Sequence, residues 1–166
     1  MRVAGIVRDS IVDGIGLRDV IFLQGCGHRC EGCHNLETWD RESGYALSPK
    51  EASLILKNSS NDITISGGEP LLQYTELLQL MCYITHYNPK KRFWLYTGFR
   101  YEEIPPHMWM KLSQYVDVVV DGRFEIDKKD PNLLFRGSSN QRLVDLKKSI
   151  ACGKVVDWEE EYVERY

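Results

Sequence analysis

Three of the five cysteines of this 166-residue chain lie within eight residues, at Cys26, Cys30 and Cys33, in the stretch GCGHRCEGCHN. The spacing is C-x3-C-x2-C, and no fourth cysteine follows nearby. Cysteine thiolates are soft ligands that hold zinc or iron–sulfur clusters. A centre with three protein ligands keeps one position open, which is typical of a metal that binds a substrate. The spacing therefore predicts a working metal centre.

Two kinds of centre are compatible with this spacing. His28 or His34 could complete a Cys3His zinc site, but zinc sites usually pair two short ligand knuckles separated by a longer stretch. A [4Fe–4S] cluster on three thiolates leaves one iron without a protein ligand, and the spacing differs from the bacterial ferredoxin run. Because all three cysteines belong to one loop, we favour the cluster.

Four short apolar runs, each followed by a glycine-containing turn, predict strands over residues 17–24, 62–66, 92–97 and 116–120. Three helices are expected: one capped by Ser48 with Pro49 and Glu51, one with the apolar stripe Leu77, Leu80, Met81 and Ile84, and a short one over 108–115. Strands that alternate with helices predict a single α/β domain with a parallel sheet.

The distinctive stretches of the sequence all follow predicted strands. These stretches are the cysteine loop, SGGEP at 66–70, TGF at 97–99 and DGRF at 121–124. Ligands of open parallel sheets bind beyond the carboxyl ends of the strands. We therefore expect the four stretches to face one site.

Composition excludes several classes of function. The formal net charge is -3 and the chain has no block of Lys and Arg, so we expect no nucleic-acid partner. The opening residues contain no apolar signal-peptide core, and no later run has the length of a membrane span. We therefore expect a cytoplasmic protein without a membrane partner, whose reduced thiols serve as metal ligands rather than disulfides.

The C-x3-C-x2-C motif resembles the signature of the radical S-adenosylmethionine enzymes, and SGGEP resembles a second motif of that family. The resemblance implies an α/β fold, a partial (incomplete) radical-SAM βα barrel with a parallel sheet. It also implies one [4Fe–4S] cluster held by Cys26, Cys30 and Cys33, with S-adenosylmethionine on the open iron. The cluster would then cleave S-adenosylmethionine reductively to a 5′-deoxyadenosyl radical.

The same resemblance assigns residues to S-adenosylmethionine. Gly67 and Gly68 would let backbone carbonyls approach its ammonium, Glu69 would supply a countercharge, and His34 could stack on the adenine. Thr97 and Asp121, at strand ends, could contact the ribose or carboxylate, or could only cap loops. The implied cofactor-binding residues are Gly32, Cys33, His34, Ser66, Gly67, Gly68, Glu69, Thr97 and Asp121.

Within that superfamily, the motifs VDGIGLR, GCGHRCEGCHN, SGGEPL, WLYTGF, VDGRF and DPNLLFRGSSNQR, over residues 12–142, resemble the activating proteins of anaerobic (class III) ribonucleotide reductases. This resemblance implies hydrogen abstraction from a glycine of the large subunit of an anaerobic ribonucleoside-triphosphate reductase, with a flavodoxin-type reductant as electron donor. The alternatives are an activase of pyruvate formate-lyase or another glycyl radical enzyme, and a structural Cys3His zinc-binding interaction module.

The remaining expectations concern residues outside the cysteine loop. We expect Cys82 to be a buried small hydrophobe, and the side chains of Trp39, Trp94 and Trp109 to lie in the core. Arg136 and Arg142 of FRGSSNQR would either grip the partner or pair with acidic residues of this chain. We expect one domain over 1–166, with a short acidic tail at about 153–166 as a solvated face.

Overall fold

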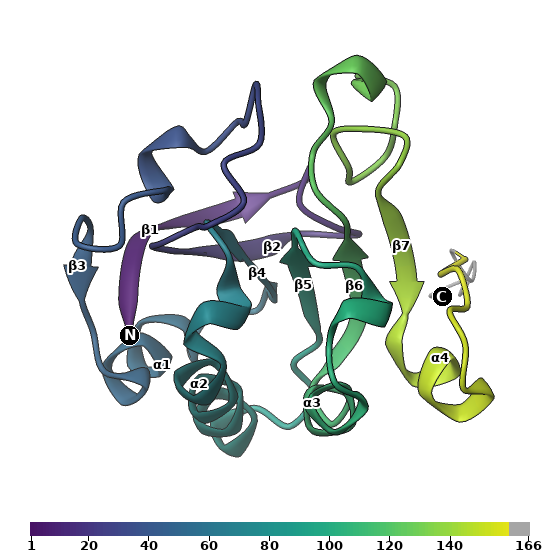
Figure 1. Ribbon diagram of the computed structural model, residues 1–166. Coiled ribbons are helices and arrows are strands. Elements are labelled where there is room, and N and C mark those ends of the chain that lie inside the picture. The colour runs from purple at the N-terminus through teal and green to yellow at the C-terminus, as the bar shows by residue number, and fades with distance from the viewer. Residues whose placement is uncertain (160–166) are drawn as a thin grey trace.

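The computed structural model describes residues 1–159 (Figure 1). In this part of the chain seven strands form one sheet, in the order β3-β1-β2-β4-β5-β6-β7. The strands are β1 (Arg2–Ser10), β2 (Arg18–Leu23), β3 (Tyr45–Ala46), β4 (Asp62–Gly67), β5 (Phe93–Thr97), β6 (Val116–Asp121) and β7 (Arg142–Asp145). The α-helices are α1 (Pro49–Leu56), α2 (Tyr74–Tyr87), α3 (Pro106–Leu112) and α4 (Leu146–Cys152). Short 3-10 turns are η1 (Leu36–Thr38), η2 (Pro70–Gln73), η3 (Tyr101–Glu103) and η4 (Ile126–Lys128).

The sheet is parallel at its centre and antiparallel at both edges. Strands β2, β4, β5 and β6 are mutually parallel neighbours, which confirms the four predicted strands. At the edges, β1 pairs antiparallel with β2, β3 with β1, and β7 with β6. The prediction of a parallel sheet was therefore incomplete, because it did not include the three antiparallel edge strands β1, β3 and β7.

The helices begin and pack as their sequence patterns predict. Ser48 caps α1: its hydroxyl accepts from the Glu51 amide at 3.2 Å, and its own amide donates to the Glu51 carboxylate at 2.8 Å. Such a reciprocal pair satisfies two of the donors that a helix start leaves unpaired. The predicted stripe of α2 is fully buried. Helix α3 lies two to three residues earlier than expected.

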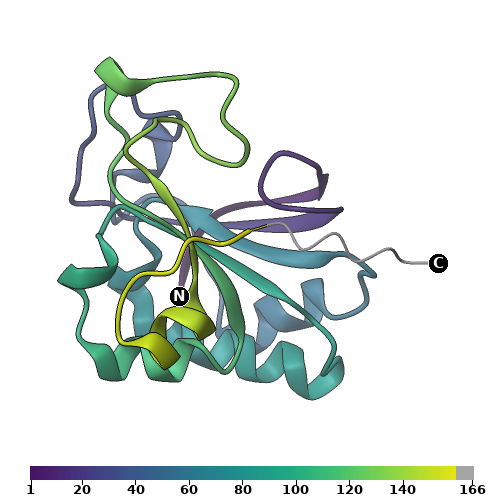
Figure 2. The ribbon, with the colours of Figure 1, turned by 90° about the vertical axis from the view of Figure 1, so that its right-hand side faces the viewer.

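All four helices cover one face of the sheet (Figures 1 and 2). Side chains alternate between the faces of a strand. Phe93 and Leu95 of β5 accordingly belong to the main core under the helices, whereas Trp94 belongs to a second cluster with Val118 and Val120. Loops cover this second face only in part, and the space they leave is the cavity described below.

Two expectations about peripheral residues were wrong. Cys82 is exposed, because it follows Met81 on α2 and points away from the core. The tail is not merely a solvated face, since the Trp158 amide donates to the Leu143 carbonyl at 2.7 Å and its ring packs on Trp94 with centroids 5.1 Å apart. Residues 160–166 of the tail lie outside the described residues.

Of the three tryptophans expected in the core, two are buried and one is not. Trp94 and Trp109 are buried, as expected, while Trp39 is only half-buried and lines the cavity. Across residues 1–159, the structure contains no helix with the length and apolar character needed to cross a membrane.

Candidate functional site

A cavity of about 600 Å³ lies over the second face of the sheet, at the carboxyl ends of the parallel strands. Its floor is one residue from each of these strands: Phe22, Ser66, Tyr96 and Val120. Phe22 pairs in register with Ser66 across β2 and β4, and Tyr96 with Val120 across β5 and β6. Of these four residues only Ser66 was predicted from the sequence, although strand alternation places Phe22 and Tyr96 opposite the buried Ile21 and Leu95.

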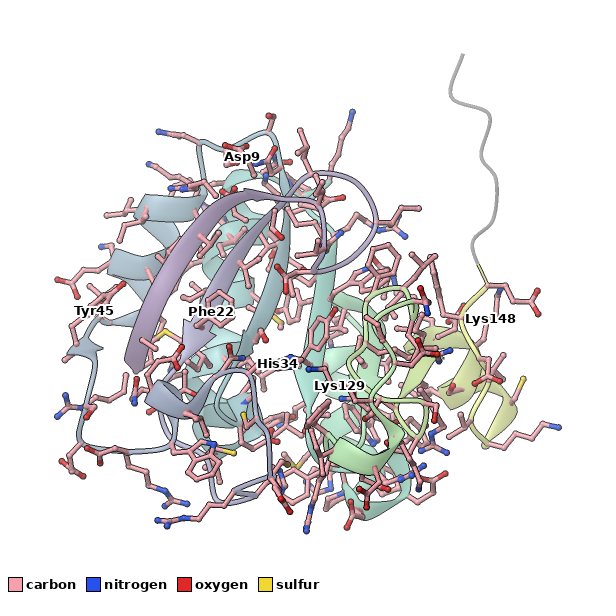
Figure 3. The ribbon with its side chains drawn as sticks, turned by 90° about the horizontal axis from the view of Figure 1, so that it is seen from above. Asp9, Phe22, His34, Tyr45, Lys129 and Lys148 are labelled. Carbon is pink, nitrogen blue, oxygen red and sulfur yellow. The ribbon has the colours of Figure 1, made fainter. Side chains whose placement is uncertain are left out.

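The walls of the cavity are the four stretches that follow the predicted strands. The cysteine loop rises on one side and residues 122–141 on the other, as Figure 1 shows. Seen from above, His34 lies between these two segments (Figure 3). The predicted site residues that line the cavity are Cys26, Cys30, Cys33, His34, Ser66, Gly67, Gly68 and Thr97. The expected convergence on one site is therefore confirmed.

The three thiols fit a thiolate-held centre by the chemistry of the donor set. All three line the cavity, whereas Cys82 and Cys152 are exposed and lie outside it. Burial raises the pKa of the Cys30 thiol, a backbone hydrogen bond from Phe124 opposes this shift, and the neighbouring Cys33 and Cys26 raise the pKa further. In residues 1–159 no three Cys, His, Asp or Glu side chains are already grouped as a metal site.

Backbone hydrogen bonds join the base of the cysteine loop to the SGGEP turn. The Gly68 amide donates to the Leu23 carbonyl at 2.8 Å, and the Glu69 amide donates to the Gly25 carbonyl at 2.8 Å. At the returning end of the loop, the Gly25 amide donates to the Thr38 carbonyl at 2.7 Å. The ends of β2 and β4 therefore fix where the loop begins.

This close approach explains the two glycines of SGGEP. Gly67 has φ +113°, and a Cβ there would lie 2.3 Å from the Leu23 amide nitrogen. A Cβ on Gly68 would lie 2.3 Å from the Gly25 carbonyl oxygen. Only glycine has no Cβ to collide with these backbone atoms. The glycines are thus required by the packing of two strand ends, in addition to any contact with a cofactor.

Glu69 is 1 % exposed and is surrounded by donors of its own chain. Its carboxylate accepts from the Leu71 amide at 2.9 Å, the Thr97 hydroxyl at 2.9 Å, the Gly98 amide at 2.8 Å and His28 Nε2 at 2.8 Å. A carboxylate has about four lone-pair positions. These four donors occupy them, so Glu69 has no free position for a hydrogen bond to a ligand, and it does not line the cavity.

Two other predicted cofactor residues lie outside the cavity lining. Asp121 is fully buried, and its carboxylate accepts from Arg142 and from the Tyr101 amide at 2.7 Å. Gly32 is an exposed residue of the cysteine loop, and a Cβ there would lie 2.7 Å from Ile126 Cδ1. The structure therefore gives Asp121 and Gly32 packing partners within this chain.

His34 and Phe124 form an aromatic corner of the cavity. Their ring centroids are 5.0 Å apart with planes at 45°, and both residues line the cavity. Phe124 belongs to DGRF, so the corner joins the cysteine loop to the segment after β6. A planar ligand group entering the cavity would meet these rings, which is compatible with the expected contact of His34 with adenine.

The VDGIGLR stretch forms a lip over the cavity. Arg18 is 1 % exposed and donates to the Thr64 hydroxyl at 2.7 Å and to the Ile15 carbonyl at 3.2 Å. The Thr64 hydroxyl in turn donates to the Asp13 carbonyl at 2.6 Å. Burial lowers the pKa of Arg18 to about 10. This network fastens the lip to the sheet, so that Val12 reaches the cavity from a fixed position.

The two arginines of the FRGSSNQR segment have different surroundings in the structure. Arg142 pairs with Asp121 and Glu102, so the same-chain alternative is right for this residue. Arg136 lines the cavity and donates to the Gln141 carbonyl at 3.2 Å. No ion pair of Arg136 occurs in residues 1–159, and its Nε is buried there without a hydrogen-bond partner.

Comparison with known proteins agrees with this geometry. The model of a family described as "4Fe-4S single cluster domain" matches residues 12–144, a range that contains the three cysteines and every cavity wall except part of the lip. A protein of Enterobacteria phage T4 is 38% identical over 140 residues, which cover 81% of this chain and 87% of that protein. A protein of Escherichia coli (strain K12) is 38% identical over 141 residues, 80% of this chain and 90% of that protein. One of Pasteurella multocida (strain Pm70) is 35% identical over 141 residues, 80% of this chain and 89% of that protein. All three carry the name "Anaerobic ribonucleoside-triphosphate reductase-activating protein".

Proposed function

The chain belongs to the family of anaerobic ribonucleoside-triphosphate reductase-activating proteins, and from this premise we propose that it generates the glycyl radical of such a reductase as a radical S-adenosylmethionine enzyme. The observation that carries the proposal is the placement of Cys26, Cys30 and Cys33 in one cavity, at the ends of parallel strands and apart from both other cysteines. The proposal implies that the sheet corresponds to the incomplete barrel of that superfamily.

Three thiolates of this chain would hold a [4Fe–4S] cluster. When bound, the cluster supplies the electron that cleaves S-adenosylmethionine to methionine and the 5′-deoxyadenosyl radical, which takes a hydrogen atom from the glycine. Ser66, Gly67 and Gly68 present mainly backbone to the cavity, because two of them have no side chain. We assign the contact with the cofactor ammonium to this backbone and not to Glu69, whose acceptor positions are filled.

The floor of the cavity suits chemistry that must exclude water. Phe22 and Val120 are apolar, and the Tyr96 hydroxyl donates a hydrogen bond to the Phe135 carbonyl at 2.7 Å. Burial raises the pKa of Tyr96, so its phenol keeps its proton at neutral pH. A closed, apolar site prevents side reactions of a reactive intermediate with water. These residues would therefore shield the hydrogen-abstraction step.

The rim of the cavity suits a protein substrate. Exposed apolar side chains stand on both sides of the mouth: Ile11 and Val12 are 71% and 70% exposed, and Leu134 is 66% exposed. Apolar groups that gather at an open cavity mark a site of interaction. In the proposal the glycine-bearing loop of the reductase large subunit enters here, and Arg136 contacts its backbone. A flavodoxin-type protein would supply the electron to the cluster.

Anaerobic reconstitution with iron and sulfide tests the proposal. Electron paramagnetic resonance of the reduced protein is expected to show a cluster signal that changes when S-adenosylmethionine is added. A colourless protein that holds stoichiometric zinc would contradict the cluster and favour the Cys3His module.

A second assay tests the partner. The loaded protein is incubated with an anaerobic ribonucleotide reductase or with pyruvate formate-lyase, and the glycyl radicals are counted. Radicals on the reductase alone would support the proposal. Radicals on pyruvate formate-lyase alone would contradict the proposal and indicate an activase of that enzyme.

A further inference from the structure

His28 lies in the middle of the cysteine loop, two residues from both Cys26 and Cys30, yet its ring is bound outside the loop. The side chain is 7% exposed, and Nε2 lies 2.8 Å from Oε2 of Glu69. Within residues 27–34, two side chains form hydrogen bonds with parts of the chain outside the loop. The His28 ring binds Glu69, and the Cys30 thiol binds the Phe124 backbone. The loop therefore reaches the strand ends through two side chains that are not cysteines, His28 and Asn35, whose amide donates to the Gly67 carbonyl at 3.5 Å, and of the two only His28 lies between the cysteines.

The place occupied by the imidazole is shaped by its neighbours. The Phe99 ring meets it edge-on, with centroids 4.6 Å apart and planes at 73°. Gly98 lies against its other side: a Cβ there would be 2.4 Å from Cδ2 and 2.7 Å from Nε2 of His28. Any side chain at position 98 would therefore push the ring out of its place. Glycine at the end of β5 is what admits the histidine.

The direction of the hydrogen bond follows from the other partners of Glu69. The carboxylate already accepts from two amides and one hydroxyl. Because it acts as the acceptor for all of them, the imidazole nitrogen that faces it carries the proton. A charge-assisted hydrogen bond that is shielded from water is among the stronger polar contacts in proteins.

We propose that His28 is a positioning residue that fastens the cysteine loop to the ends of β4 and β5 before the cluster is bound. Glu69 joins the two strand ends, since it starts the turn after β4 and binds Thr97 and Gly98 of β5 and its following turn. His28 adds the loop to this junction. The role of the His28–Glu69 hydrogen bond in cluster binding rests on the proposed function, but the hydrogen bond itself is present in the cluster-free chain.

Trypsin provides a direct test, because the loop carries an exposed cleavage site directly after His28, the Arg29–Cys30 bond. The variants are His28→Leu, which fills the space without a donor, and His28→Gln, whose amide can donate from nearly the same position as Nε2. In the cluster-free protein, cleavage at Arg29 is expected to be about tenfold faster in His28→Leu, because cleavage follows local opening. His28→Gln is expected to restore a rate close to that of the unchanged protein.

Three controls separate this effect from general loosening of the fold. Cleavage after Lys57, at the end of α1, should proceed at the same rate in every variant. His107→Leu, at an exposed position on α3, should change neither rate. Gly98→Ala leaves both partners of the hydrogen bond in place but displaces the ring, and it should open the loop as His28→Leu does.

The same variants then undergo reconstitution with iron and sulfide, followed by the appearance of the cluster absorbance. Slower incorporation in His28→Leu and Gly98→Ala, with rescue in His28→Gln, would support the inference. Equal cleavage at Arg29 in His28→Leu and the unchanged protein would overturn it, as would failure of His28→Gln to rescue. If the unchanged protein took up no cluster, the proposed function would fail, whereas the proteolysis result would still decide the role of His28.

Discussion

Arg142, the first residue of β7, donates from Nε to Oδ1 of Asp121, the last residue of β6, over 2.9 Å. The Asp121 side chain is fully buried, and Arg142 also pairs with the exposed Glu102. The hydrogen bonds and the two carboxylates raise the pKa of Arg142, although burial opposes the shift. Residues 21 positions apart are thus joined at the edge of the cavity. Asp121 therefore joins β6 to β7 through a buried ion pair.

Replacement of Arg142 should therefore reduce stability. Arg142→Ala leaves a buried carboxylate without its charge partner, and such a loss lowers the free energy of unfolding by about 3 kcal/mol. Urea unfolding of the cluster-free protein measures the change. Lys147→Ala removes the exposed partner of Asp117 and should cost less than about 1 kcal/mol. Equal losses in both variants would contradict the special role of the buried pair.

Each cysteine of the loop should be required for the cluster. Cys26→Ala, Cys30→Ala and Cys33→Ala are expected to abolish both the cluster and the cleavage of S-adenosylmethionine, because the other cysteines lie outside the cavity. Iron and sulfide analysis after reconstitution measures the first property, and chromatography of 5′-deoxyadenosine the second. Cys82→Ala and Cys152→Ala are the matched controls. Loss of the cluster in Cys152→Ala would refute three-cysteine ligation.

Glu69→Gln should affect the cysteine loop as well as the binding of the cofactor. The amide group places at least one donor against the four donors that now surround the carboxylate. An unsatisfied buried polar group of this kind costs about 1–3 kcal/mol. If Glu69 only supplied a countercharge to the cofactor, iron content would stay normal and the dissociation constant for S-adenosylmethionine would rise, whereas the structure predicts that iron content falls too.

Both quantities can be measured on one preparation of Glu69→Gln after reconstitution. Glu31→Gln changes an exposed carboxylate of the same loop and should leave both unchanged. Full iron content in Glu69→Gln would show that the carboxylate does not organise the loop.

Arg136→Ala should separate docking from chemistry. Arg136 lines the cavity beside exposed Leu134, and its charge is not neutralised by an ion pair within residues 1–159. Formation of the glycyl radical on the reductase is expected to fall about tenfold, as for loss of one contact of an arginine at an interface. Reductive cleavage of free S-adenosylmethionine should continue unchanged.

The control for this experiment is Arg92→Ala, which removes an arginine paired with Asp117 just before β5, at the opposite end of that strand from the cavity. Electron paramagnetic resonance counts the radicals, and chromatography counts the 5′-deoxyadenosine. A parallel fall in both products for Arg136→Ala would show that the arginine supports the fold or the cofactor instead of the partner.

The centre of the sheet and the convergence of the motifs can be predicted from the sequence alone. Strands β2, β4, β5 and β6 are short, mainly apolar runs that end at a glycine or within two residues of one, and the start of α1 is a capping box; both signals act over a few residues. Because parallel strands bring their carboxyl ends to one edge, the cysteine loop and SGGEP could be placed together without coordinates. The edge strands β1, β3 and β7 were not predicted.

The role of each polar side chain at that edge, by contrast, depends on contacts between distant parts of the chain. Glu69 and Asp121 look alike in the sequence, since each is a carboxylate after a predicted strand; Glu69 was expected to meet the cofactor, and Asp121 either to contact it or to cap a loop. Their roles depend on hydrogen-bond donors from distant segments. His28 and Gly98 donate to the Glu69 carboxylate, and Arg142 donates to the Asp121 carboxylate. A buried carboxylate accepts hydrogen bonds from the donors that the fold brings within about 3 Å. These donors are distant in the sequence, so the residues next to the carboxylate do not predict them.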